Sequence, residues 1–252
     1  MSTNGIRGNG ERGNGERVGA VVVAAGRSAR AGQDKIWADL CGRPVLAHTL
    51  DGLAGSGVID ELAVVVQPER DPDARALLAA CGLRGTVVPG GPRRRDSVHN
   101  GLQALQGCQW VIVHDGARPF LRSDLPRLGL DAARSTGAAV AAIRSRDTVK
   151  RVQEWQVLST PPREEMWLVQ TPQVFRYELL AAALESTDDD VTDEATLLER
   201  MGISVRVFAG NADNWKLTSA EDLELARVWC RALREREHVA AAPDEHVLAR
   251  QA

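Results

Sequence analysis

The chain of 252 residues lacks several patterns that mark common kinds of site. Its four cysteines lie far apart without a Cys-x-x-Cys pair, and its five histidines form no His-x-x-x-His pattern. These absences argue against a zinc site and against a disulfide framework, and we expect reduced thiols in a cytoplasmic protein. No apolar run reaches about 18 residues, so the sequence predicts no membrane span and no membrane partner.

An excess of charge of one sign is also absent. The formal net charge is −3, which argues against a general nucleic-acid binder. Hydrophobic residues make up 44% of the chain, enough for the core of one large α/β domain. Residues 1–17 are rich in Gly, Asn, Arg and Glu, and we expect a disordered tail there. Residues 18–235 then form the folded domain, and 236–252 form a flexible C-terminal tail.

Short apolar segments alternate with helical patterns along the folded domain. The alternation of continuous apolar strands with helices predicts an α/β fold, with a mostly parallel sheet covered on both faces. The expected strands are 19–24, 61–67, 85–88, 110–114, 138–143 and 203–208. The expected helices are 44–54, 71–81, 97–106, 123–135, 176–185, 193–201 and 219–234.

Residues 146–173 interrupt this alternation. They consist of extended pieces in which apolar and polar residues alternate, with Pro161 and Pro162 between the second and the third. The pattern predicts a β-arm that projects from the sheet. Because exposed arms with open strand edges often pair with a second copy, we expect a homodimer.

The first strand ends in small residues, and two cations follow, at Arg30 and Lys35. Small residues let the backbone approach a phosphate closely, and cations match its charge. The segment nevertheless lacks the second glycine of a Walker A motif, and Gly26 is not followed by the pattern of a dinucleotide loop. It therefore predicts a triphosphate site of another kind, or else an ordinary loop after a core strand.

Two further expected strand ends carry polar residues. Residues 90–97 combine two glycines and a proline with three arginines before a helix, which fits an anion site as well as a solvated turn, and Asp96 or Ser97 can cap that helix. Asp115 ends an apolar strand, where a carboxylate can meet a Mg²⁺ shared with substrate phosphates or can simply form a turn. Ligands of open α/β sheets bind at such carboxyl ends.

Taken in order, these segments resemble the 2-C-methyl-D-erythritol 4-phosphate cytidylyltransferase (IspD) family of the non-mevalonate isoprenoid pathway. The resemblance covers about residues 18–230. It is carried by Ala24-Ala25-Gly26 with Arg30 and Lys35, Gly90-Gly91 with Arg94 and Asp96-Ser97-Val98, Val113-His114-Asp115-Gly116-Ala117-Arg118-Pro119, Arg146-Asp147-Thr148-Val149-Lys150, Gln170-Thr171-Pro172-Gln173, Thr192-Asp193-Glu194-Ala195 and Asp213-Asn214-Trp215-Lys216.

The resemblance implies a three-layer, Rossmann-like nucleotidyltransferase fold and transfer of a cytidylyl group from CTP to the phosphate of methylerythritol phosphate, with Mg²⁺. It implies that the catalytic cations are Arg30, Lys35 and Lys216. It places CTP against Ala24, Ala25, Gly26, Gly91, Arg94 (near the base) and Ser97. It places the acceptor against Asp115 (which also faces the metal), Arg118, Thr148, Arg163 and Thr171, with Arg163 and Thr171 from a partner's arm.

The chain departs from the family pattern beside the catalytic lysine. Asp34 stands where the family usually has proline, and the loop from Gly26 to Lys35 is about two residues shorter than usual. A carboxylate at this position could pair with Lys35 and draw its charge from the phosphate. Three other functions stay open: a cytidylyltransferase for ribitol 5-phosphate or another polyol phosphate, a nucleotidyltransferase for a sugar 1-phosphate, and a non-catalytic nucleotide-binding paralogue.

Overall fold

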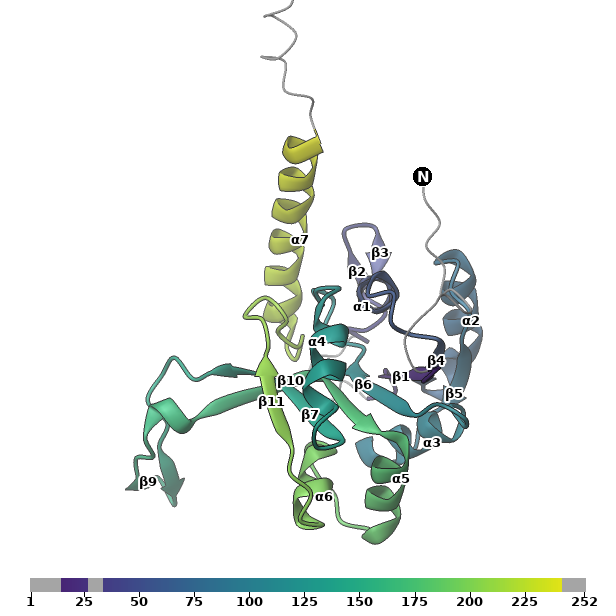
Figure 1. Ribbon diagram of the computed structural model, residues 1–252. Coiled ribbons are helices and arrows are strands. Elements are labelled where there is room, and N and C mark those ends of the chain that lie inside the picture. The colour runs from purple at the N-terminus through teal and green to yellow at the C-terminus, as the bar shows by residue number, and fades with distance from the viewer. Residues whose placement is uncertain (1–14, 27–33, 242–252) are drawn as a thin grey trace, which may run out of the picture.

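The computed structural model describes residues 15–26 and 34–241 (Figure 1). The helices and strands of this part are, in chain order, β1 (Val18–Val23), β2 (Asp39–Leu40), β3 (Arg43–Pro44), α1 (Val45–Gly55), β4 (Glu61–Val66), η1 (Pro68–Arg70), α2 (Asp71–Ala80), β5 (Thr86–Pro89), α3 (Arg94–Gln103), β6 (Trp110–Asp115), α4 (Leu125–Ala133), β7 (Ala138–Arg144), β8 (Arg151–Gln153), β9 (Gln156–Ser159), η2 (Arg163–Glu165), β10 (Trp167–Arg176), α5 (Tyr177–Ser186), α6 (Ala195–Arg200), β11 (Arg206–Ala209) and α7 (Ala220–Ala241).

A central sheet of seven strands organises the described residues, in the order β11-β7-β10-β6-β1-β4-β5. Neighbouring strands are parallel throughout, except that β10 is antiparallel to both β6 and β7. The sheet is therefore mostly parallel, as the sequence predicts. Because β10 alone is reversed, the carboxyl ends of the other six strands lie along one edge.

Alternate residues of the central strands enter two separate cores. On β1, Ala20 and Val22 pack in the core with α1, α2 and α4, whereas Val21 packs in the core with α3, α5 and α6. This alternation is the period of two that a strand with both faces covered requires. The result is a three-layer α/β structure, which confirms the predicted fold class.

The β-arm extends away from the sheet (Figure 1). Its base is the end of β7 paired with the start of β10, and its tip is the antiparallel pair of β8 and β9. Residues 170–173, which the sequence assigns to the arm, are instead buried in the main sheet. The arm therefore ends at Val169, where the pairing of β10 with β7 shifts its register before Gln173.

The ordered domain also extends beyond both of its predicted boundaries. Glu16 accepts a hydrogen bond from the Trp110 indole over 3.1 Å, and the backbone N–H of Arg17 donates to Gln109 over 2.7 Å. These two residues therefore contact the folded domain, although the predicted domain begins at residue 18. At the other end α7 continues to Ala241, past the predicted boundary at 235. No helix among residues 15–26 and 34–241 combines the length and the apolar character needed to cross a bilayer.

Candidate active site

Hydrogen bonds attach the residues that follow β1, β5 and β6 to neighbouring strands of the sheet. The N–H of Ala24 donates to Val65 over 2.7 Å, and the N–H of Gly90 donates to Val66 over 2.8 Å. The N–H of Gly116 donates to the carbonyl of Val23 over 2.9 Å. The sheet thus brings together three of the segments in which the sequence places functional residues.

The glycine loop after β5 packs directly on the loop after β1. A Cβ at Gly90 would lie 2.2 Å from that of Ala25, and a Cβ at Gly91 would lie 2.3 Å from that of Asp96. Both positions therefore need glycine. The hydroxyl of Ser97 accepts a hydrogen bond from the N–H of Gly91 over 3.1 Å. Asp96 accepts from the N–H of Arg93 over 3.1 Å and so caps α3, one of the two caps that the sequence allows.

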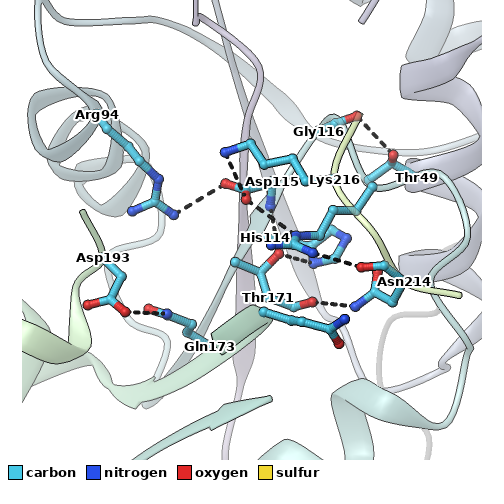
Figure 2. A network of polar contacts seen from close by, with 12 residues as sticks. Thr49, Arg94, His114, Asp115, Gly116, Thr171, Gln173, Asp193, Asn214 and Lys216 are labelled. Carbon is cyan, nitrogen blue, oxygen red and sulfur yellow. Dashed lines mark hydrogen bonds and ion pairs between the residues drawn. The ribbon is translucent and has the colours of Figure 1, made fainter. Parts of the chain in front are cut away.

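Asp115, at the carboxyl end of β6, is the centre of the polar network in Figure 2. Its Oδ1 lies 3.3 Å from Arg94. Its Oδ2 lies 3.1 Å from the Lys216 ammonium and 3.4 Å from Arg118. One cation three residues away, Arg118, and two that are distant in sequence, Arg94 and Lys216, thus surround one carboxylate.

The charge state of Asp115 follows from two opposing effects. Burial disfavours the ionised form, since only 6% of the residue is exposed. The attraction of Lys216, Arg94 and Arg118 outweighs burial and holds the pKa of Asp115 far below its usual range. Asp115 is therefore a carboxylate at neutral pH, as a metal or cation ligand must be.

Arg94 contacts two carboxylates. Besides contacting Asp115, its guanidinium forms an ion pair with Glu194, which is fully buried. Burial raises the pKa of Glu194, and the charge of Arg94 opposes that effect. The place of Arg94 near the base stays a prediction.

The two neighbouring arginines also have partners within the protein. Arg93 donates to the backbone carbonyl and the carboxylate of Asp188, over 2.6 and 2.7 Å. Arg95 is buried and donates to the carbonyls of Leu184 and Asp189. Arg93 and Arg95 therefore attach the start of α3 to the end of α5 and to the residues that follow it.

A second chain of contacts runs beside Asp115. The backbone N–H of Asp115 donates to the Thr171 hydroxyl over 3.1 Å, and that hydroxyl lies 2.9 Å from Nδ1 of His114. Burial lowers the pKa of His114 to about 3, so its ring is neutral at pH 7 and Nδ1 can accept the hydroxyl proton. Asn214 donates to the carbonyl of Thr171 over 2.7 Å.

The segment before α7 is attached to this edge at several points. The side chain of Gln170 donates to the carbonyl of Asn211 and accepts from its N–H, over 2.9 and 3.2 Å. Arg118 donates to the carbonyl of Asn214 over 2.7 Å. These bonds explain how Lys216, far from Asp115 in sequence, reaches its carboxylate.

Lys35 is buried, and its ammonium donates to the carbonyl of Thr218. It therefore lies beside the segment that carries Lys216. The predicted pairing of Asp34 with Lys35 is wrong, because the Asp34 carboxylate faces Arg70 at 3.3 Å. Burial raises the pKa of Asp34.

The remaining predicted residues lie outside the network. Thr148 and Arg163 are exposed on the arm, where Arg163 contacts the carbonyl of Arg146 over 3.4 Å. Arg30 falls outside the described residues. Sequence reasoning gave no role to Glu194, Asn214 or Gln170. The signal that could have drawn attention to them is their place in the motifs that carry the family resemblance, namely Gln170-Thr171-Pro172-Gln173, Thr192-Asp193-Glu194-Ala195 and Asp213-Asn214-Trp215-Lys216.

Comparisons with known proteins decide the family. The model of the 2-C-methyl-D-erythritol 4-phosphate cytidylyltransferase family (IspD) matches residues 18–232. The chain belongs to this family. A relative of that name from Dehalococcoides mccartyi is 43% identical over 215 residues, which cover 84% of this chain and 95% of the relative. The resemblance read from the sequence is confirmed, and with it the prediction of a nucleotidyltransferase.

Solved structures of IspD proteins share the fold. The 4-diphosphocytidyl-2C-methyl-D-erythritol synthase of Anaerococcus prevotii is 30% identical with a TM-score of 0.79, and the match covers 86% of this chain and all of that one. The cytidylyltransferase of Thermus thermophilus is 32% identical with a TM-score of 0.69, over 84% and 98% of the two chains.

The neutral, buried His114 predicts a pH dependence of stability. In the unfolded chain His114 has a pKa near 6.5, whereas in the folded protein its pKa is about 3. Between these two pKa values the unfolded state binds a proton and the folded state does not, so the free energy of unfolding decreases as the pH falls from about 6.5 toward 3. The substitution His114→Asn keeps an acceptor near Thr171 but removes the titration. We expect the stability advantage of the original chain over the variant to shrink by about 2 kcal/mol between pH 7 and pH 5, in urea unfolding.

The packing loss that the same substitution causes does not depend on pH. Val140→Ala, in the same sheet, provides the matched control, because it removes buried volume without an ionisable group. Its cost should be equal at both pH values. A constant difference between the original chain and His114→Asn from pH 7 to pH 5 would contradict the neutral state of His114.

Proposed function

We propose that this chain joins CTP and 2-C-methyl-D-erythritol 4-phosphate into 4-diphosphocytidyl-2-C-methyl-D-erythritol and releases pyrophosphate. The observation that carries the proposal is the cluster of Arg94, Arg118 and Lys216 around Asp115, at the carboxyl edge of the sheet of an IspD family member. The relatives bear the name of this activity. The cluster provides the charges that a reaction between two phosphate groups needs.

The reaction is an in-line displacement at phosphorus. A phosphate oxygen of the acceptor forms a bond to the α-phosphorus of CTP, and the bond from that phosphorus to the bridging oxygen breaks as pyrophosphate leaves. The attacking oxygen is already an anion, so the reaction needs no protein base. Catalysis then consists of alignment and of stabilising negative charge in the transition state.

Lys35 and Lys216 suit that electrostatic task. The two residues lie near each other, because the Lys35 ammonium donates to the carbonyl of Thr218, two residues after Lys216. We assign these two ammonium groups to the α-phosphate and to the departing pyrophosphate, and we assign Arg30 the same role. Asp34 does not neutralise Lys35, because its partner is Arg70. The departure from the family pattern at Asp34 therefore leaves the charge of Lys35 available.

The loops at the other end of the site suit the nucleoside. Ala24, Ala25 and Gly26 follow β1, and Gly91 with Ser97 forms the facing turn. Side chains here are small or absent, which leaves backbone N–H and C=O groups to recognise a base and a ribose. We place cytidine between these two loops.

The residues present fit a Mg²⁺ ion that arrives with CTP. Asp115 is ionised, and among the described residues no group of three or more His, Cys, Asp or Glu side chains could hold a metal by itself, so the ion would share its ligands with the triphosphate. A single carboxylate beside phosphate oxygens is a common magnesium site. The ion would neutralise charge on the triphosphate, and Asp115 would hold it there. Thr171 is buried beside Asp115 of its own chain, which corrects its assignment to a partner's arm. Arg118, Thr171 and Thr148 of one chain then remain for the acceptor, with Arg163 of a partner's arm.

The arm supports the homodimer. It carries several exposed apolar side chains, which are unusual on a monomer surface: Val152, Trp155, Val157, Leu158, Trp167, Leu168 and Val169. A second copy of the chain would cover them and bring Arg163 to the neighbouring site.

All four cysteines are thiols rather than disulfides, which supports a cytoplasmic location.

Pyrophosphate release tests the function and separates the alternatives. With Mg²⁺ present, CTP, UTP, ATP and GTP are each combined with methylerythritol phosphate and with ribitol 5-phosphate. We expect release only with CTP and methylerythritol phosphate. Preference for ribitol phosphate would favour the other polyol reaction, and a preference for another base would favour a sugar-phosphate enzyme. No release with any CTP pair would exclude cytidylyl transfer to these acceptors.

Replacing Lys35 tests the catalytic assignment. Lys35→Ala removes a cation that serves the transition state, so kcat should fall by about a hundredfold or more. Thermal unfolding checks that the variant is folded. Arg75→Ala, which removes an exposed cation on α2, serves as the control and should retain full activity. If Lys35→Ala keeps its rate within about threefold, Lys35 has no catalytic role.

The dimer is tested with two substitutions of similar exposure. Leu158 on the arm is 52% exposed, and Leu225 on α7 is 58% exposed. Leu158→Asp should shift the protein from dimer to monomer in sedimentation at micromolar concentration, because it places a charge in the buried contact. Leu225→Asp should leave the dimer intact. A monomeric original chain, or equal effects of the two variants, would argue against the arm as the interface.

A further inference from the structure

Glu194 is completely buried yet belongs to no part of the proposed chemistry. It directly precedes α6, but Asp193 caps that helix, with its carboxylate accepting from the N–H and the hydroxyl of Thr196 over 3.0 and 2.8 Å. Both oxygens of Glu194 face one nitrogen of Arg94, Nη1. A buried carboxylate that does not cap its own helix and contacts an arginine at the site requires another explanation.

Arg94 connects Glu194 to the centre of the site. The nitrogen Nη1 contacts Glu194, while Nη2 lies 3.3 Å from Oδ1 of Asp115. A guanidinium group is planar and rigid, so fixing one nitrogen also fixes the direction of the other. Glu194 therefore determines where Arg94 meets Asp115.

The two oxygens of Asp115 have different partners. Arg118 and Lys216 contact Oδ2, whereas Arg94 contacts Oδ1. Without Glu194, Arg94 could turn toward an anionic ligand, and Oδ1 would lose this contact. The cations Arg118 and Lys216 would then hold the carboxylate at Oδ2, and Oδ1 could change its direction. Arg94 thus supplies the second point of contact that fixes the orientation of the Asp115 carboxylate.

The backbone around Glu194 is anchored independently. Arg93 and Arg95 donate to Asp188 and Asp189, and Arg200 forms an ion pair with Asp189 over 2.8 Å. The segment from α5 to α6 thus stays attached to α3 without the pair of Arg94 and Glu194. Removing the charge of Glu194 should therefore alter Arg94 more than the course of the chain.

We propose that Glu194 is a positioning residue for cytidylyl transfer, which holds Arg94 so that the Asp115 carboxylate keeps one orientation toward the reacting phosphates. The inference rests on the proposed function and adds to it a residue that does not touch substrate. It predicts that Glu194 acts through Arg94 alone.

A kinetic double-mutant cycle tests this dependence. Glu194→Gln and Arg94→Gln should each lower kcat by about tenfold or more, with KM for CTP changed less than about threefold. The kcat of the double variant should lie within about twofold of the kcat of Arg94→Gln, because Glu194 acts only through Arg94 and has no further effect once Arg94 is removed. Arg200→Gln, which also removes an anchor of this segment, should keep its kcat. Losses that multiply in the double variant, or an unchanged kcat in Glu194→Gln, would overturn the proposal.

A second measurement needs no activity. Urea unfolding of Arg94→Gln, Asp115→Asn and their combination gives the coupling between these two residues, in the original chain and in the Glu194→Gln background. We expect the coupling to fall by more than half when Glu194 is replaced, and an unchanged coupling would contradict the inference. If Glu194→Gln does not fold, Glu194→Asp takes its place and should show the same loss in smaller measure. Absent cytidylyl transfer by the original chain would contradict the proposed function, whereas this coupling would still decide the role of Glu194.

Discussion

The carboxylate of Asp115 can be buried as an anion only because cations from three separate parts of the chain reach it. Arg94 belongs to α3, Arg118 follows β6, and Lys216 follows β11. Breaking a buried ion pair by removing one partner commonly costs about 3–5 kcal/mol. The positions of α3 and of the segment before α7 are therefore coupled to the end of β6. The same coupling assembles the site before any substrate binds, which spares the reaction the cost of reorganising charges.

The topology of the sheet makes this convergence possible. With β10 reversed and the other strands parallel, the loops after β1, β5, β6 and β11 open on one edge, while Thr171 of β10 reaches the same place from within its strand. The edge has two chemically different ends. The end with Gly90 and Gly91 offers backbone groups and little side-chain volume, whereas the end around Asp115 offers fixed charges. A ligand with a flat base and a charged phosphate chain matches that division.

The sequence predicts those parts of the site in which pattern and chemistry are local. The strand ends at Ala24 and Asp115 follow from apolar runs that stop at small or acidic residues. Contacts between residues distant in sequence are harder to predict. Arg94 and Glu194 are 100 positions apart. A run of arginines before a helix fits an anion site as well as it fits ion pairs with a distant segment. The prediction of a pair between Asp34 and Lys35 failed although the two residues are adjacent in sequence. Adjacent residues of opposite charge suggest an ion pair, but Asp34 contacts Arg70 and Lys35 contacts Thr218.

A count of charges shows why this site needs anionic ligands. Arg94, Arg118 and Lys216 contribute three positive charges, and Asp115 and Glu194 contribute two negative ones, which leaves an excess of one, and Lys35 nearby adds another. A nucleoside triphosphate and a phosphate monoester together carry several negative charges more than this excess. Their close approach therefore favours further positive charge, which a divalent cation bound with the triphosphate would supply. Mg²⁺ remains part of the proposed function, and it suits a site whose cations Arg94, Arg118 and Lys216 each contact a carboxylate.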